Sequence, residues 1–311
     1  MDKLPFVSVV VPVYNSAGFI EKLLDNLLAQ DYPKHLHEII IVDNHSRDNT
    51  KDIIGKYPFI LAEENEIQSS YAARNKGLEI AKGEVVAFTD ADCQPLVEWL
   101  SEGVRTLLDS NADVVAGNVK FIYSEKPTAA EIYDSITHMQ MESEVKEKGV
   151  APTANLFIKR EMFEKIGVFD SRVKSGGDVQ WTRKATTSGY QLVYSEKAAV
   201  KHPTRNLAQF TKKVMRTGAG RIHARLAAGH SVIHEFFYTP YAIFFKIHLN
   251  KDMLKRRFEE RGLSQREVRF WKVCSVGLFT NFISHVATLV EFFRIFPLIL
   301  CKKYKVRKHE K

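Results

Sequence analysis

Two carboxylates one residue apart carry the clearest chemistry in this sequence. Asp90 and Asp92 follow the apolar run 85–89 (VVAFT), which is typical of a buried strand. Side chains two residues apart on an extended backbone point the same way, so both acids can face one site where the strand ends. Two such acids repel each other unless a cation or the donors of a ligand lie between them. The pair therefore indicates a site for a metal ion and a phosphate group.

Two further polar clusters follow apolar runs near the N-terminus. Residues 7–13 lead into Tyr14 and Asn15, and residues 38–42 lead into Asp43. In an open α/β sheet, ligands bind beyond the carboxyl ends of the strands, so these clusters and the acidic pair would face one crevice. Asp43 is suited to accept hydrogen bonds from a base or a ribose, and Tyr14 to stack on the base. Each feature alone is weak, because Asp and Asn are common in turns after strands.

The elements that must position these residues alternate along the first 200 residues. Apolar runs and helical spacing predict strands at 7–13, 38–43, 59–62, 85–90, 112–122, 154–158, 191–194 and 198–201, and helices at 18–30, 50–57, 69–82, 96–108, 128–148, 160–166 and from 178 onward. This alternation predicts an α/β fold with a doubly wound, mostly parallel sheet. Strand signals stop near residue 205, so we expect one domain over residues 1–204 and a helical extension over 205–311.

The charge changes sign near the same position. Residues 1–200 contain 22 Lys and Arg against 30 Asp and Glu, whereas residues 201–311 contain 23 against 7. A basic surface rich in aromatics suits an anionic membrane, and a solvated helical face is the plainer alternative. No recognition motif accompanies the charge, so we expect no nucleic-acid partner.

The longest stretch without Asp, Glu, Lys or Arg covers residues 273–290 and barely reaches the length of a membrane span. We expect helices that lie in the membrane interface, with a homo-oligomer interface as the alternative. Residues 1–5 lack the basic start and apolar core of a signal peptide, and the cysteines show no disulfide framework. The expected location is the cytoplasm, peripheral or monotopic at the cytoplasmic face of the inner membrane.

Taken together, the motifs resemble those of the inverting family 2 glycosyltransferases, which have a GT-A fold and use nucleotide-sugar donors. The matching segments lie within residues 6–203 and are 11–15 (VPVYN), 43–44 (DN), 73–77 (ARNKG), 90–92 (DAD), 155–170 and 176–178 (GGD). Each motif is unspecific alone, whereas the combination is specific. The resemblance implies metal-assisted transfer of a single sugar from a nucleotide sugar to a glycan or lipid-linked acceptor. The family usually uses uridine nucleotides, so the expected donor is a UDP-sugar.

The resemblance also implies a role for each matching residue. The nucleotide sugar would be held by Pro12, Tyr14, Asn15, Asp43, Arg74 and Asp90, a divalent ion (Mn²⁺ or Mg²⁺) by Asp92 and His202, and Asp178 would be the catalytic base. Oxygen ligands suit either ion, and an imidazole ligand favours Mn²⁺. Inverting transfer needs one carboxylate that takes the proton of the acceptor hydroxyl.

Three of these residues also have plainer interpretations. An ion pair on a helix face is the plainer interpretation of Arg74, and a lone histidine such as His202 is more often structural. Asp178 follows two glycines at the start of a predicted helix, where Asp is among the best N-cap residues.

The acceptor side is less defined. Gln180 and Arg183 lie three residues apart on one face of the predicted helix, and Trp181 suits either an acceptor platform or the core. The processive synthases of the family carry Gln-x-x-Arg-Trp, whereas Lys184 follows Arg183 here. This departure favours single-sugar transfer.

Two other function classes remain as alternatives. A sugar nucleotidyltransferase would need a glycine-rich, basic loop after the first strand, where this chain has VPVYNS at 11–16. A non-catalytic scaffold that binds glycans or membranes would not need Asp92, Asp178 and His202 together.

Overall fold

The computed structural model describes residues 3–173, 175–227, 231–245, 249–261 and 268–300. Contacts divide the chain into two compact units, one formed by residues 1–122 and 139–203 and the other by residues 123–138 and 204–311. We expected residues 123–138 in the domain over 1–204, whereas the contacts group them with residues 204–311. The domain assignment stays a prediction, and residues 301–311 of the expected extension lie outside the described residues.

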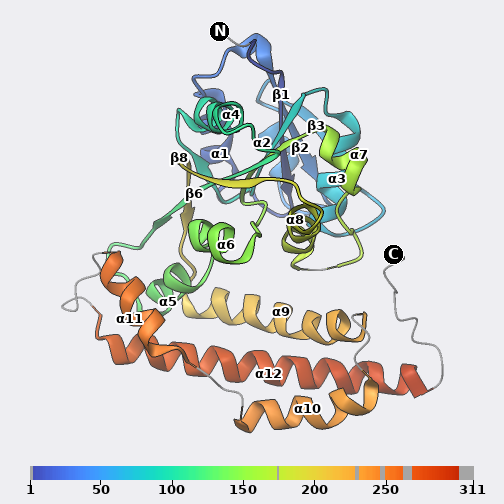
Figure 1. Ribbon diagram of the computed structural model, residues 1–311, viewed down its shortest axis with the longest axis vertical. Coiled ribbons are helices and arrows are strands. Elements are labelled where there is room, and N and C mark those ends of the chain that lie inside the picture. Colours follow the sequence, from blue (N-terminus) through green and yellow to red (C-terminus); the bar gives the residue numbers. More distant parts are fainter. Residues whose placement is uncertain (1–2, 174, 228–230, 246–248, 262–267, 301–311) are drawn as a thin grey trace. The chain divides into compact units, whose positions relative to one another are not determined.

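A single mixed sheet forms the centre of the first unit (Figure 1). Its strands are β1 (Val7–Val13), β2 (His37–Asp43), β3 (Ile60–Glu63), β4 (Val85–Thr89), β5 (Gln94–Pro95), β6 (Val114–Ile122), β7 (Asn155–Lys159) and β8 (Leu192–Pro203), in the order β3-β2-β1-β4-β7-β6-β8-β5. Neighbouring strands from β3 to β4 are parallel, as are β6 and β8, whereas β7 is antiparallel to both of its neighbours and β5 to β8. The expected α/β, mostly parallel sheet is confirmed.

The central strands are apolar because both of their faces are covered. All of β4 is buried, and in β1 every residue except Pro12 is buried. Such continuous apolar runs are typical of parallel strands with helices on both sides. The register pairs Val13 with Asp43, so β1 and β2 end level with each other and present their following residues at one edge.

The last long strand contains an irregularity that sets its register. We expected two short pieces at 191–194 and 198–201, but β8 is one strand. Its pairing with β6 jumps from Gly117 opposite Ser195 to Asn118 opposite Ala199. Residues 196–198 are therefore extra residues in β8, and the regular ladder resumes before His202.

Helices of the first unit pack on this sheet. They are α1 (Ile20–Leu28), the 3₁₀ turn η1 (Lys34–Leu36), α2 (Thr50–Ile54), α3 (Ser70–Ile80), α4 (Trp99–Asp109), α6 (Met141–Lys148), α7 (Glu161–Ile166) and α8 (Gly177–Thr187). Helix α3 lies against β1 and β2 at close range, since a Cβ added at Gly77 would lie 2.3 Å from Val10 Cγ1. The close approach fixes α3, which carries Arg74, against the two strands.

The second unit is helical, as expected for the C-terminal extension. It contains α5 (Ala129–Thr137), α9 (Leu207–Ala227), α10 (Val232–Phe245), α11 (Lys251–Glu260) and α12 (Phe270–Leu300). Helix α12 packs against α9 and α10 (Figure 1). A single helix over 128–148 was wrong, because α5 and α6 are separate and Met139 between them has a φ of 48°.

Among the described residues, one helix is long and apolar enough to cross a membrane by length and composition, Phe270–Pro297. Within its most apolar window, 39% of the residues are buried inside the protein. Core helices of proteins without a membrane span also meet these criteria, so the helix alone does not assign a membrane span.

Candidate active site

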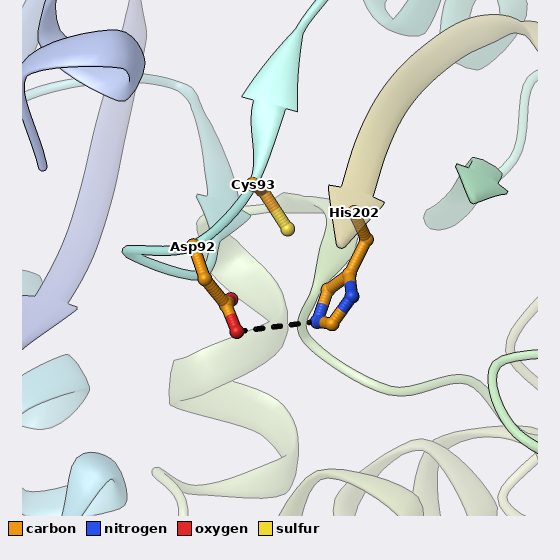
Figure 2. Close-up of side chains that lie close together, drawn as sticks. All are labelled: Asp92, Cys93 and His202. Atoms are coloured by element: carbon orange, nitrogen blue, oxygen red, sulfur yellow. Dashed lines mark ion pairs between the residues drawn. The ribbon is translucent and has the colours of Figure 1, made fainter. Parts of the chain in front are cut away.

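Asp92 and His202 come together from two strands that are not neighbours in the sheet. Asp92 lies in the turn after β4, and His202 lies at the end of β8 (Figure 2). His202 Nε2 is 3.4 Å from Asp92 Oδ2, and the side chains are 1% and 33% exposed, respectively. The pair thus has a buried nitrogen ligand and a partly exposed oxygen ligand, which is a donor set suited to a divalent ion.

The backbone orients the His202 ring. Its Nδ1 lies 2.6 Å from the carbonyl oxygen of Pro203. A carbonyl can only accept a hydrogen bond, so Nδ1 carries a proton and the other ring nitrogen is directed at Asp92. A backbone carbonyl that fixes the tautomer in this way is typical of histidines that bind metal ions. The residues present therefore fit a divalent ion.

Cys93 is a third potential ligand that we did not predict (Figure 2). Its Sγ, one carboxylate oxygen of Asp92 and one ring nitrogen of His202 lie within 4.8 Å of one another. The thiol is buried and contacts the carbonyl oxygen of Ala154 at 3.7 Å. Burial raises the pKa of Cys93 well above its usual range. A soft sulfur ligand also suits Mg²⁺ or Mn²⁺ less well than carboxylate oxygens do.

Arg74 and Asp90 form a partly buried ion pair beside this site. Arg74 Nη2 lies 2.5 Å from Asp90 Oδ1, and the Arg74 side chain is 5% exposed. Desolvation raises the pKa of Asp90, while the charge of Arg74 opposes the shift. Arg74 Nε is buried and has no hydrogen-bond partner among the described residues. The expected alternative, an ion pair on a helix face, does not describe so buried a guanidinium.

The loops after β1 and β2 are joined by hydrogen bonds. Asn15 donates its N–H to Ser46 Oγ at 2.9 Å and accepts one at Oδ1 from the N–H of Arg47 at 2.8 Å. Asn15 and His45 both have left-handed backbones, with φ of 46° and 66°. The Asn15 side chain thus holds the neighbouring loop in place, and Tyr14 beside it is 47% exposed.

Asp43 lies buried at the end of β2, between these loops. Its Oδ2 accepts a hydrogen bond from the N–H of Ser46 at 3.1 Å. Its Oδ1 is buried and lacks a hydrogen-bond partner within the part of the chain that the structure describes. A buried carboxylate oxygen without a donor is costly, and it fits a site that a ligand completes. Pro12, two residues before Tyr14, is half-buried in β1.

Asp178 lies in the first turn of α8, whose N-cap is Gly176. The simple N-cap alternative for Asp178 is therefore wrong. Its Oδ1 accepts hydrogen bonds from Tyr71 Oη at 3.0 Å and from the N–H of Val179 at 2.9 Å. Its Oδ2 accepts two from Thr153. The carboxylate is held in one orientation by residues far apart in the sequence.

Of the three acceptor-side candidates, Trp181 belongs to the core. It is 4% exposed, its ring packs against Phe163 and Phe169, and its Nε1 donates to the carbonyl oxygen of Gly167. The platform interpretation of Trp181 is therefore wrong. Gln180 and Arg183 are exposed on the same helix.

Comparison with known proteins identifies the family. The family model for glycosyl transferase family 2 matches residues 8–167. The chain belongs to this family. Glycosyltransferase AglE of Haloferax volcanii is similar to it, with 44% identity over 224 residues that cover 70% of this chain and 74% of AglE. The predicted family membership is confirmed, and the chain is a glycosyltransferase.

Solved structures of other family members share the fold. A mannosyltransferase from Pyrobaculum calidifontis, PcManGT, in complex with GDP-Man and Mn²⁺, matches 94% of this chain and 88% of its own with a TM-score of 0.60 and 22% identity. TarS of S. aureus, residues 1–349 in complex with UDP-GlcNAc, matches 96% of this chain and 92% of its own with a TM-score of 0.54 and 20% identity. The predicted GT-A fold is confirmed.

The sequence did not point to two polar residues of the site, Tyr71 and Thr153. Tyr71 lies one helical turn before Arg74, which is the only signal for it in the sequence. Thr153 precedes the family segment at 155–170 and carries no motif of its own.

Proposed function

We propose that the chain transfers a single sugar from a nucleotide sugar to a hydroxyl group of a glycan or lipid-linked acceptor, with inversion at the anomeric carbon and with a divalent ion. The observation that carries the proposal is the approach of Asp92 and His202 to 3.4 Å, one partly exposed and one buried. The roles below are part of the same proposal.

The donor would lie between the ends of β1, β2 and β4. Asp43 Oδ1 offers an unpartnered acceptor for the hydroxyl or N–H groups of a nucleoside, and Tyr14 offers an exposed ring. Pro12 and Asn15 shape the same loop. Arg74 has an unpartnered Nε beside Asp90, which suits it to the charge of the donor. A UDP-sugar is the proposed donor.

Asp92 and His202 would hold the divalent ion, with Mn²⁺ favoured by the imidazole ligand and Mg²⁺ as the alternative. When bound, the ion supplies positive charge that neutralises the leaving diphosphate. A separate acid is then not needed on that side of the sugar.

Asp178 would take the proton from the acceptor hydroxyl. As the proton moves to the carboxylate, the hydroxyl oxygen forms a bond to the anomeric carbon and the bond from that carbon to the diphosphate oxygen breaks. Attack opposite the leaving group inverts the configuration. Gln180 and Arg183 are exposed on the same helix as Asp178 and would contact the acceptor.

The helical unit would bring the enzyme to its acceptor at the cytoplasmic face of the membrane. Helix α12 exposes large apolar side chains, among them Trp271 (59% exposed) and Phe293 (51%), and α9 exposes Lys212 and Arg216. Exposed apolar groups beside cations suit an anionic lipid surface. A homo-oligomer through these helices is the alternative. Sedimentation with anionic vesicles tests this part, and a protein that stays in the supernatant as an oligomer would exclude the membrane surface.

Nucleotide binding tests the metal and donor sites together. Isothermal calorimetry with UDP and with GDP, each with and without Mn²⁺, should show binding that depends on the ion, and Asp92→Ala should abolish this dependence. Asp109→Ala, at an exposed aspartate that ends α4, is the matched control and should bind as the wild type does. Unchanged ion-dependent binding by the Asp92 variant would contradict the metal assignment.

A further inference from the structure

Tyr71 and Thr153 contact the carboxylate to which the proposed function gives the role of base. Tyr71 Oη donates to Asp178 Oδ1 at 3.0 Å. Thr153 donates its backbone N–H and its hydroxyl to Oδ2 at 3.0 and 3.2 Å. The donors come from α3 and from the loop before β7, 107 and 25 residues away in the sequence. Local helix formation would not require either contact.

The start of α8 is shaped around the Tyr71 ring. A Cβ at Gly177 would lie 3.0 Å from Tyr71 Cε2 and 3.1 Å from Cζ, and 2.9 Å from Val173 Cγ2. Tyr71 is 5% exposed, so its ring has little room to withdraw from an added methyl group. Glycine at 177 is therefore what allows the tyrosine to reach the carboxylate of the next residue.

The other face of the ring supports the donor side. Arg74 lies one turn later on α3, and its Cζ is 5.5 Å from the centroid of the Tyr71 ring. This geometry is that of a cation–π contact. Arg74 in turn forms the ion pair with Asp90. Tyr71 therefore touches the residues on both sides of the reaction centre, Asp178 through its hydroxyl and Arg74 through its ring.

We propose that Tyr71 is a positioning residue of the enzyme, which orients the Asp178 carboxylate through its hydroxyl and supports Arg74 through its ring, with Thr153 as the second support of the carboxylate. The inference rests on the proposed role of Asp178 as base. A donor to a carboxylate stabilises the charged form and fixes the orientation of the group. The charged groups that act on the pair are Arg74 and Asp90.

The tyrosine is suited to remain a donor throughout the reaction. Burial raises the pKa of Tyr71, and the negative charge of Asp178 raises it further. The hydroxyl therefore keeps its proton while the carboxylate accepts the proton of the acceptor, and Tyr71 is not itself a base.

Tyr71→Phe removes the hydroxyl and keeps the ring under Arg74. We expect kcat to fall by roughly tenfold to a hundredfold, in the range of one lost charge-assisted hydrogen bond, with the KM for the donor nearly unchanged. Because the charged form of the base loses a donor, the acid limb of the pH–rate profile should move to higher pH. A residue that only fills space would not move this limb.

Tyr57→Phe is the matched control. Tyr57, three residues after α2, also donates to an aspartate, Asp25 on α1, at 2.7 Å, but this pair is exposed. This variant should keep the kcat and the pH profile of the wild type. Thr153→Val keeps the backbone N–H on Asp178 and removes only the hydroxyl, so it should shift the limb in the same direction by less. It also provides the test if Tyr71→Phe does not fold.

Two results separate this inference from the proposed function. If Asp178→Asn keeps normal turnover, the base assignment within the proposed function is wrong, and the positioning role fails with it. If Asp178→Asn abolishes turnover while Tyr71→Phe and Thr153→Val both keep the wild-type kcat and pH profile, only the positioning role is overturned.

Discussion

The proposed donor side and the proposed base side of the site are built in opposite ways. On the donor side, Asp43 Oδ1 and Arg74 Nε are buried without hydrogen-bond partners among the described residues. On the base side, both oxygens of Asp178 have donors within the protein. The first side leaves bonds for a ligand to make, whereas the second fixes its carboxylate before a ligand arrives. Preorganisation of this kind avoids reorienting the group during the reaction.

The backbone follows the same division. The donor-side loops place two residues other than glycine in the left-handed region, Asn15 and His45, whereas the turn into α8 uses Gly176, with a φ of 79°. Left-handed backbone costs L-residues free energy that glycine avoids. The strain therefore lies on the side with unpartnered atoms, where binding of a ligand can offset it.

The largest expected effect is at the base. Asp178→Asn keeps the size of the side chain but removes the proton acceptor, so kcat should fall by roughly 10²- to 10⁴-fold, the usual contribution of a general base. Calorimetry should show unchanged UDP binding, since the donor side is untouched. Weakened nucleotide binding in this variant would contradict the division between the two sides.

A smaller effect is expected at Asp43. Asp43→Asn replaces a buried charge that lacks a partner on one oxygen, so nucleotide affinity should fall by about tenfold or more while thermal stability is kept or slightly raised. Calorimetry and a thermal melt without nucleotide measure the two quantities. A clear loss of stability in the free protein would show that the Asp43 carboxylate is structural and would remove it from the donor site.

The smallest effect is expected at His45. His45→Gly relieves the left-handed backbone and should stabilise the free protein by about 1 kcal/mol in denaturant unfolding. Asn15→Gly is the comparison and should gain less, because Asn tolerates this conformation and the variant also loses the hydrogen bond from the N–H of Arg47 to Asn15 Oδ1. No gain at His45 would mean that the backbone there is not strained.

Much of the fold was predictable because the buried central strands are runs of mostly apolar residues in the sequence. The runs at 7–13, 38–43 and 85–89 are mostly apolar, and the structure places all three as parallel neighbours. The antiparallel β7 was not predictable, since strand direction depends on a crossover path that periodicity does not encode. Trp181 was ambiguous for a related reason: its spacing on α8 fits a buried face as well as an acceptor face.

The residues of the site were predictable only where a sequence motif includes them. Asp90, Asp92 and Asp43 follow apolar runs, whereas the assignment of His202 and Asp178 needed the family resemblance. Tyr71 and Thr153 contact Asp178 only in the folded chain, and the separation of 107 positions between Tyr71 and Asp178 leaves no local pattern in the sequence. The catalytic roles themselves stay predictions until the variants above are measured.

The irregularity in β8 makes the orientation of His202 sensitive to insertions and deletions at residues 196–198. Side chains alternate between the two faces of a strand, so the number of extra residues at 196–198 determines the parity with which β8 rejoins the ladder. An insertion or deletion of one residue there can shift the pairing of residues 199–203 with β6 by one residue. His202 would then point to the opposite face of the sheet, away from Asp92. A change of two residues would return His202 to the original face of the sheet, but with its pairing to β6 displaced by two residues. The proposed metal site therefore depends on the register of a segment that contributes no ligand.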